Sequence, residues 1–552
     1  MVASKPAKFT PTMASLLVPV IILVIFHPLL CSNSKTHHAR KLFSSTPAIN
    51  AACRATQLPQ LCKSSLSNLP AKATPQQIIR AAMELSSDAA KKSHLLSTDL
   101  FTASRANANV TAAANNCVEF MEYSIELIGK SQNGKIEQGI KDVKAWMSAA
   151  LAYEYDCASD LRYVNNSDRI SAVIQSVDYA TNLSSNALSM VDALDTYGTK
   201  MALWKPPSTE RSSNAHDRRL DYTGYGLEGI DHIDAVPDVT VSKEKGGSVS
   251  SIQAAVDAAP DYSARKFVIH IRAGVYEEIV RIPRSKTNLV FIGEGMQRTV
   301  IRGSKYVPSL PGAVTVYDSA TVGVNGDGFV ARDLTFENAY QGPQTHQAVA
   351  LRVDSDLSAF YRCAFLSHQD TLYAHTLRQF YKNCTIKGTH DFIFGNAAAI
   401  FDKCSIRVRP RQLRSKSGEK DPVTAQGRTD PAQSTGFVFN GCSVDGTEDY
   451  MKDFRANPSI HMVYLGRPWK MYSRTVFLNS YLGNVIRPEG WMAWNGTFAL
   501  DTLFYGEFQN HGPGAEISGR VPWCNQISQK NVGMYTVQSF IQGQQWLPST
   551  QI

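Results

Sequence analysis

The chain has 552 residues, of which 43 % are hydrophobic and 19 % are charged, so it is long enough for two or three domains with their own cores. Its formal net charge of +8 lies mostly in the first 220 residues, because 33 Lys and Arg face 31 Asp and Glu from residue 221 onward. The sequence also lacks a basic helix with interleaved aromatic residues. These features argue against a nucleic-acid-binding protein.

Residues 1–32 have the pattern of a targeting segment. Lys5 and Lys8 precede an apolar run over 14–26, which ends at His27-Pro28 and small residues. Thirteen residues are few for a membrane span but typical of a signal-peptide core, so we expect a secreted, extracellular protein. The alternative is a signal anchor that holds a proform in the membrane, because the apolar run continues beyond Pro28.

Asn-X-Ser/Thr sequons also fit an exported chain, since they are acceptors for N-glycosylation. The candidate glycosylation sites are Asn109, Asn165, Asn182, Asn383 and Asn495.

The region 48–200 has helical periodicity. Thr74-Pro75-Gln76-Gln77 forms a capping box with proline at the first helical position, and apolar residues follow it at helical spacing. A second long amphipathic pattern covers 170–194. We therefore predict an all-α four-helix bundle over 48–200.

Four cysteines belong to this helical region. Cys53 and Cys62 are nine residues apart, and Cys117 and Cys157 are forty apart. In an exported chain this even set indicates two disulfides, and we expect each short-range pair to form, although three connectivities remain open.

Residues 201–236 have the composition of a linker, with Lys205-Pro206-Pro207-Ser208 followed by the dibasic pair Arg218-Arg219. A dibasic pair in an exposed linker between two folded domains is a typical site for a processing protease. The alternative is that Arg218 and Arg219 are ordinary solvated charges.

Four segments farther along repeat one pattern, in which an aromatic residue lies three positions before a cysteine. They cover 360–365, 381–386, 401–406 and 439–444. The first three cysteines, Cys363, Cys384 and Cys404, are 21 and 20 residues apart. This period predicts an all-β right-handed parallel β-helix over 237–549. We also expect a disulfide between Cys404 and Cys442.

Two carboxylates have the same position in this repeat. Asp370 lies seven residues after Cys363, and Asp391 lies seven after Cys384, so stacked coils about 4.8 Å apart would bring the acids together. Two like charges at this separation cannot both ionise cheaply, so one pKa should rise while the other stays low. The alternative is a polar ladder that only satisfies turns.

Further polar residues accompany these acids. Gln347 lies one coil before Asp370, and Gln369 directly precedes it, so two amides and two acids should share one face. Arg467 could stabilise the ionised acid, and Trp469 offers a flat face to a sugar ring.

Five motifs make the pattern specific. They are QAVAL at 347–351, QDTLY at 369–373, DFIFG at 391–395, VTAQGRTDP at 423–431 and LGRPW at 465–469. Together they resemble the plant pectin methylesterases over 237–547. The upstream bundle with its four spaced cysteines resembles the pectinesterase-inhibitor domain that precedes the enzyme in one branch of that family.

The resemblance implies hydrolysis of the methyl esters of cell-wall homogalacturonan in the apoplast, without a cofactor or metal. Asp391 would be the nucleophile and Asp370 the general acid and then base. Gln347 and Gln369 would donate to the oxyanion, Arg467 would orient Asp391, and Trp469 would bind substrate. The implied partners are the polysaccharide, a proteinaceous pectinesterase inhibitor and a processing protease, and the chain should be a monomer.

The chain departs from the family at three positions. His368 stands where an aromatic residue is usual, His390 stands where valine is usual, and Phe336 lies near the position of a disulfide partner for Cys363. In a regular strand His390 would point away from Asp391, so we expect it to alter packing more than chemistry.

Other activities fit less well. Pectate lyases need clustered acids for calcium, and no such cluster accompanies Asp370 or Asp391. The adjacent Asp-Asp, Gly-His-Gly and Arg-Ile-Lys signatures of polygalacturonases are absent. A different class would be a binding protein, in which the bundle is fused to an inactive β-helix that holds cell-wall polysaccharide.

Overall fold

The structure is a computed structural model that describes residues 46–134, 136–164, 167–210, 236–244, 246–308, 314–341, 346–411 and 418–550. The targeting segment 1–32, the sequon at Asn165 and the pair Arg218-Arg219 lie outside the described residues. Among the described helices, none combines the length and the apolar character that a membrane crossing needs.

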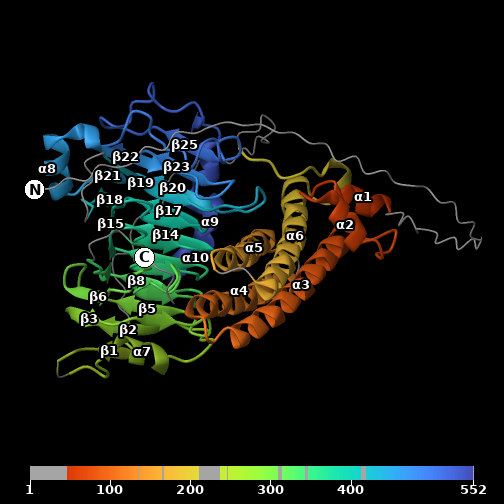
Figure 1. Cartoon of the computed structure of the whole chain (residues 1–552), viewed down its shortest axis with the longest axis horizontal. Helices are drawn as coiled ribbons and strands as arrows, with labels where there is room; N and C mark the ends of the chain where they lie inside the picture. Colours follow the sequence, from red (N-terminus) through yellow and green to blue (C-terminus); the bar gives the residue numbers. More distant parts are fainter. Residues whose placement is uncertain are drawn as a thin grey trace, which may run out of the picture. The chain divides into compact units, whose positions relative to one another are not determined.

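The first described region is an all-α bundle, as predicted. Its four long helices are drawn from orange to yellow in Figure 1 and are α3 (Pro75–Ala103), α4 (Ala108–Gln132), α5 (Ile140–Arg162) and α6 (Asp168–Tyr197). The short helices α1 (Pro47–Cys53) and α2 (Pro59–Ser65) precede them.

Local sequence explains where the long helices begin. The Thr74 side chain accepts from the Gln77 amide while the Gln77 side chain accepts from the Thr74 amide, which is the predicted capping box. Asn107 and Ser167 cap α4 and α6 by a single bond each, in which the side chain accepts from the amide of Val110 or Ile170. Apolar side chains from all four helices then form one core.

Both disulfides predicted for the bundle are present, Cys53–Cys62 and Cys117–Cys157. The start of the predicted linker is ordered. Met201–Leu203 forms the 3₁₀ helix η1, and Trp204 is 1 % exposed and donates its indole N–H to the Gly198 carbonyl. Glu210 forms an ion pair of 2.7 Å with Arg474 of the second region. Part of this segment is therefore fastened to both folded regions.

The second region is a parallel β-helix with three sheets (Figure 1), and each coil from β2 to β22 contributes one strand to each sheet in turn. The first sheet contains β1 (Val239–Val241), β2 (Phe267–Ile271), β5 (Leu289–Ile292), β8 (Val330–Arg332), β11 (Ser358–Tyr361), β14 (Arg378–Lys382), β17 (Ala398–Asp402), β20 (Gly436–Asn440), β23 (Arg474–Leu478), β25 (Phe504–Phe508) and β26 (Cys524–Gln526).

The second sheet contains β3 (Gly274–Glu277), β6 (Thr299–Gly303), β9 (Thr335–Asn338), β12 (Ala364–Leu366), β15 (Thr385–Gly388), β18 (Ser405–Val408), β21 (Ser443–Gly446) and β24 (Tyr481–Leu482). The third contains β4 (Val280–Ile282), β7 (Val322–Val324), β10 (Leu351–Val353), β13 (Leu372–Ala374), β16 (Ile393–Gly395), β19 (Glu419–Gln426) and β22 (His461–Gly466). We call the turn that leads from the second sheet to the third the 2–3 bend.

Short helices close the solenoid. Helix α7 (Ile252–Ala258) contributes Ile252, Ala255 and Val256 to the core inside the coils. Helices α9 (Val537–Ile541) and α10 (Gly543–Thr550) pack apolar side chains against the outer face of the first sheet. The remaining helices are α8 (Glu448–Ala456), η2 (Pro458–Ile460) and η3 (Val532–Tyr535).

The repeat found in the sequence is a pair of interior ladders. One is aromatic: successive rings of Phe360, Tyr381, Phe401, Phe439 and Phe477 stack with centroids 4.4 to 4.8 Å apart. Such stacking on every coil sets the register, because a slip by one residue would turn each ring outward.

The second ladder consists of cysteines, and it corrects one prediction. Cys404 and Cys442 are buried free thiols, as are Cys363 and Cys384, so the predicted Cys404–Cys442 disulfide is wrong. Each thiol of the later coils faces a backbone carbonyl of the preceding coil. Cys404 Sγ lies 3.4 Å from the Tyr381 oxygen, and Cys442 Sγ lies 3.2 Å from the Phe401 oxygen.

Three candidate glycosylation sites are exposed, namely Asn182, Asn383 and Asn495, whereas Asn109 is half-buried in α4. Their modification stays a prediction.

Candidate active site

Asp370 and Asp391 lie on the 2–3 bend of neighbouring coils. Strands β13 and β16 pair with Leu372 opposite Ile393. Asp370 lies two residues before Leu372, and Asp391 lies two residues before Ile393. The predicted stacking of the acids is therefore confirmed. Both have left-handed backbone angles, φ 61° and 51°, which aspartate tolerates better than most residues. Their exposed fractions are 8 % and 6 %.

Arg467 holds Asp391 through two bonds. Its Nε donates to Asp391 Oδ1 at 2.9 Å, and its Nη2 donates to Asp391 Oδ2. A guanidinium that bonds both oxygens fixes the carboxylate plane as well as its charge. The other face of Arg467 lies against Trp494, with 4.2 Å between the guanidinium carbon and the ring centroid.

The two acids differ in electrostatic environment. Burial and the nearby negative charge of Asp391 raise the pKa of Asp370 well above its usual range, and Arg467 opposes this only in part. Burial leaves the pKa of Asp391 raised as well, although the bonds and charge of Arg467 and the charge of Arg411 oppose the rise, so the expectation that one acid keeps a low pKa is wrong. Asp391 is therefore the member that ionises first, and Asp370 is the member that keeps a proton.

Gln347 and Gln369 lie beside the acids on adjacent coils. They form an isolated parallel bridge, and the Ala348 amide donates to the Gln369 carbonyl at 3.2 Å. The bridge fixes the backbones from which both side-chain amides project. Both side chains are half-buried, so part of each is open to solvent.

The two unexpected histidines are neutral at ordinary pH. Burial and Arg409 lower the pKa of His368 to about 4, and burial with Arg411 and Arg467 lowers that of His390 to about 3. Neither can supply the proton that a departing alkoxide needs at neutral pH. We expected His390 to point away from Asp391 if both lay in a regular strand. They lie instead in the bend between β15, which ends at Gly388, and β16, which begins at Ile393, so strand alternation does not apply to them.

Aromatic residues line the third sheet beside the acids. Tyr373 pairs in register with Phe394, and their rings stack at 4.2 Å. Trp469 meets Phe394 edge-on at 6.0 Å. Gly427 makes room for it, because a Cβ there would lie 2.8 Å from the indole. Trp469 thus lies beside the aromatic pair, and its role in substrate binding stays a prediction.

Several neighbouring residues were not predicted as part of the site. Trp494 supports Arg467, and Arg411 contributes positive charge near Asp391. In the sequence, arginines at 407, 409 and 411 alternate along one segment, and this pattern could have indicated positive charge near the site. No sequence signal places Trp494, since 103 residues separate it from Asp391 and only the coil stacking joins them.

The helical bundle packs on this same face. One apolar cluster joins bundle side chains such as Phe120 with Tyr373 and Phe394 of the third sheet, and Trp469 packs against it. Lys470, next to Trp469, lies over the ring of Tyr155 from α5, 4.7 Å from its centroid. The bundle therefore covers the aromatic residues beside the acids, and we call this surface of the β-helix, with the two acids, the groove.

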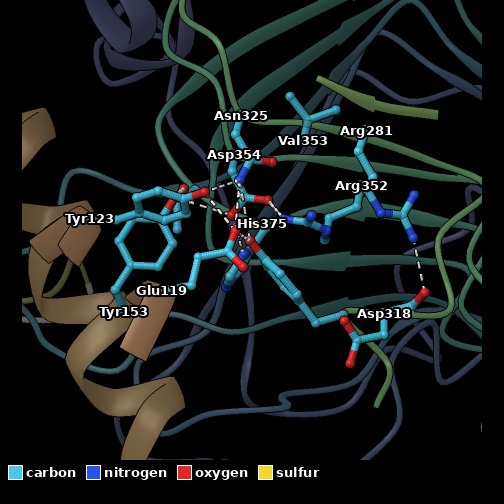
Figure 2. A network of polar contacts seen from close by, with 12 residues as sticks. Glu119, Tyr123, Tyr153, Arg281, Asp318, Asn325, Arg352, Val353, Asp354 and His375 are labelled. Atoms are coloured by element: carbon cyan, nitrogen blue, oxygen red, sulfur yellow. Dashed lines mark hydrogen bonds and ion pairs between the residues drawn. The ribbon is translucent and has the colours of Figure 1, made fainter. Parts of the chain in front are cut away.

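A polar network continues this contact (Figure 2). His375 lies between two carboxylates, with Nδ1 2.5 Å from Asp354 and Nε2 2.8 Å from Asp156 of α5. Burial alone would lower the pKa of His375, but Asp354 and Asp156 raise it to about 9. Tyr153 donates to Asp354 at 3.1 Å, and Glu119 accepts from Asn325 at 3.1 Å. The imidazolium is thus shared between the bundle and the β-helix.

Within the part of the chain that the structure describes, no group of three or more His, Cys, Asp or Glu side chains is arranged to hold a metal ion.

Comparison with known proteins identifies this arrangement. The family model named Pectinesterase matches residues 238–544, which is more than half of the chain. The chain belongs to the pectinesterase family. A second model, plant invertase/pectin methylesterase inhibitor, matches residues 47–190.

Individual relatives of the pectinesterase family agree. A probable pectinesterase/pectinesterase inhibitor of Arabidopsis thaliana is 47 % identical over 512 residues, covering 91 % of this chain and 85 % of its own length. A pectinesterase/pectinesterase inhibitor of Solanum lycopersicum is 36 % identical and covers 97 % and 94 %. Among solved structures, the pectin methylesterase from carrot is 48 % identical with a TM-score of 0.54, covering 58 % of this chain and 98 % of its own.

Proposed function

We propose that the chain hydrolyses the methyl esters of homogalacturonan in the plant cell wall, giving pectate and methanol. The observation that carries this proposal is the pair of unequal acids on one bend. Asp391 is held by two bonds from Arg467, and Asp370 beside it has a strongly raised pKa. This pair suits a carboxylate nucleophile that works with a protonated acid.

In the first half-reaction Asp391 attacks the ester carbonyl carbon and forms an acyl anhydride. The side-chain amides of Gln347 and Gln369 donate to the oxygen on which negative charge develops. Asp370 gives its proton to the methoxide, which leaves as methanol. Arg467 keeps Asp391 ionised and aimed before the attack.

In the second half-reaction Asp370 is ionised and takes a proton from water. The resulting hydroxide attacks the acyl carbon, and the C–O bond to Asp391 breaks. The uronic acid group so formed leaves and gives its proton to bulk water, while Asp391 is again ionised and Asp370 is again protonated. Each carboxyl thus returns to its starting state, and no cofactor is needed.

The substrate class follows from the groove. The stacked rings of Tyr373 and Phe394, with Trp469 edge-on, give a flat apolar surface next to the acids. Such surfaces suit the C–H faces of sugar rings, and family membership points to pectin.

Methanol release from methylated pectin tests the function directly. We expect methanol and new carboxylate in equal amounts without unsaturated sugar. Unsaturated product would favour a lyase, and tight binding without any product would favour the binding protein considered above. Both the uncut protein and a form cleaved after Arg219 should be assayed. The uncut form alone could be inactive only because the bundle covers the groove.

The bundle is proposed to restrain the enzyme until a protease cuts at Arg218-Arg219, which also implies passage through the secretory pathway. The support is the contact of the bundle with Tyr373, Phe394 and Trp469, where the polymer would lie. A tethered domain also acts at an effective concentration of order millimolar for a short linker, so modest contacts suffice.

A further inference from the structure

Aromatic residues occur on the same bend as the acids, on the two preceding coils. Tyr306 lies three residues after β6, and Tyr340 lies two residues after β9. Asp370 and Asp391 follow β12 and β15, which are the next two strands of that sheet. All four residues therefore leave the second sheet at one edge. Coils about 4.8 Å apart put the tyrosines roughly 5–10 Å along the solenoid from Asp370.

The two tyrosines form a preassembled stack. Their ring centroids are 3.9 Å apart with 23° between the planes. His346 joins them, with its ring 5.5 Å from Tyr306 and 5.9 Å from Tyr340. Tyr306 is nevertheless 37 % exposed. Part of this aromatic stack is thus open to solvent on the coils next to the acids.

Backbone bonds tie this stack to the candidate active site. The Val307 amide donates to the Gln347 carbonyl at 2.9 Å, next in the chain to Tyr306. Asn338 holds both loops, because its side-chain amide donates to the Lys305 carbonyl at 2.8 Å and its oxygen accepts from the Tyr340 amide at 3.2 Å. The rings are therefore fixed relative to Gln347, whose side chain is expected to donate to the oxyanion.

The position along the solenoid separates this surface from the aromatic groove described above. In the third sheet β7 and β10 follow the two tyrosine loops, β13 and β16 follow the two acids, and β22 leads to Trp469. The tyrosine stack and Trp469 are thus on opposite sides of the acid pair. A polymer that reaches both would pass over the reacting ester.

We propose that Tyr306 and Tyr340 form a stacking subsite for a galacturonate ring of the pectin chain, on the side of the reacting ester opposite to Trp469. This inference rests on the proposed function. An aromatic face pairs with the apolar C–H face of a pyranose ring, and it holds a polymer without reading the charge of each unit. The subsite would help long chains and do little for fragments too short to reach it.

The test uses the enzyme as the expressing cell secretes it, with a length series of methylesterified oligogalacturonides. Tyr306→Ala, and Tyr306→Ala with Tyr340→Ala, should raise KM for long oligomers by about three- to tenfold. For long oligomers kcat should stay unchanged. For the shortest substrates both kcat and KM should stay unchanged. Tyr306→Trp should retain the wild-type KM, whereas Tyr306→Leu, which keeps apolar bulk without the flat ring, should behave like alanine.

Tyr481→Ala is the matched control, because Tyr481 is also 37 % exposed and also lies beside a histidine ring, 5.8 Å from His511. It should leave KM unchanged at every length. An equal loss at all lengths, no loss at any length, or an equal loss in the Tyr481 variant would overturn the subsite. Failure of the wild-type enzyme to release methanol would instead refute the proposed function.

Discussion

At the scale of single residues, the chemistry depends on how two identical carboxyl groups come to differ. Asp370 and Asp391 are both buried and have similar backbone angles. Only Asp391 is bonded by Arg467, and that cation offsets the cost of burying its charge. The division of labour between nucleophile and acid is therefore imposed by one arginine.

Asp391→Asn and Asp370→Asn should each abolish methanol release while the fold persists, because each removes a role that water cannot fill. The loss of the acid–base component alone is on the order of 10²–10⁴ in kcat. Methanol release and circular dichroism measure the two parts of this prediction. A variant that keeps its fold and more than about a tenth of wild-type turnover would show that its residue was wrongly assigned.

Arg467→Gln should move the acid limb of the profile of kcat/KM against pH to higher pH. Burial raises the pKa of Asp391 and Arg467 lowers it, so removing the arginine raises that pKa, and ionised nucleophile then appears only at higher pH. Arg298→Gln is the control, since Arg298 is an exposed partner of Glu294. A parallel drop in rate without displacement of the limb would mean that Arg467 acts only through geometry.

At the scale of elements, helix α5 carries a buried acid of its own. Glu154 is fully buried in the bundle and accepts from Ser124 at 2.8 Å and from Ser184 at 2.9 Å. Burial raises its pKa to about 7, although both serine hydroxyls oppose the rise. Because the folded pKa lies above the unfolded one, the native state holds the extra proton. The stability of the bundle should therefore fall as pH rises from about 4.5 to 7 and stay low above that.

Glu154→Gln should remove this pH dependence and stabilise the bundle at about pH 8, by an amount on the order of 3 kcal/mol. Urea unfolding followed by helical circular dichroism at about pH 5 and about pH 8 measures it. Glu122→Gln is the control, because Glu122 is an exposed residue on α4. Equal pH dependence in Glu154→Gln and wild type would place the titrating group elsewhere.

At the scale of the whole molecule, the bundle and the β-helix share one apolar cluster and one buried imidazolium. Loss of the Asp156 carboxylate would leave His375 with one anionic partner in a buried site, which weakens the contact. The bundle should then release the groove more often.

Replacement of both Arg218 and Arg219 by alanine should keep the proform inside the cell, and the secreted wild-type enzyme should begin close to Asp221. N-terminal sequencing of the secreted protein measures this. A fully active secreted protein that begins between about residues 32 and 48 would contradict both the processing and the restraint by the bundle.

In that uncut background, Asp156→Asn should raise the residual rate of methanol release by a factor of several, because docking is weakened without any change at the acids. Asp178→Asn is the matched control, since Asp178 binds Arg162 on the exposed side of the bundle. Similar rates for all three uncut proteins would mean that the His375 contact does not hold the bundle on the groove.

The repeat, the two folded regions and six residues of the candidate site (Gln347, Gln369, Asp370, Asp391, Arg467 and Trp469) could be predicted from the sequence alone. The spacing of 21 residues places Asp370 and Asp391 in one register, and the capping box at Thr74 places the start of α3, because both are local consequences of strand and helix geometry. The two bundle disulfides were predicted from an even set of cysteines in an exported chain.

Only the tertiary structure decided the rest. The sequence suggested a bond between Cys404 and Cys442, whereas the structure shows two free thiols, each facing a carbonyl of the preceding coil. The burial that raises the pKa of Asp370, the position of Trp494 over Arg467 and the place of His375 between Asp354 and Asp156 join residues from different coils or domains. Such contacts follow from how whole elements pack, and no local pattern of residues encodes them.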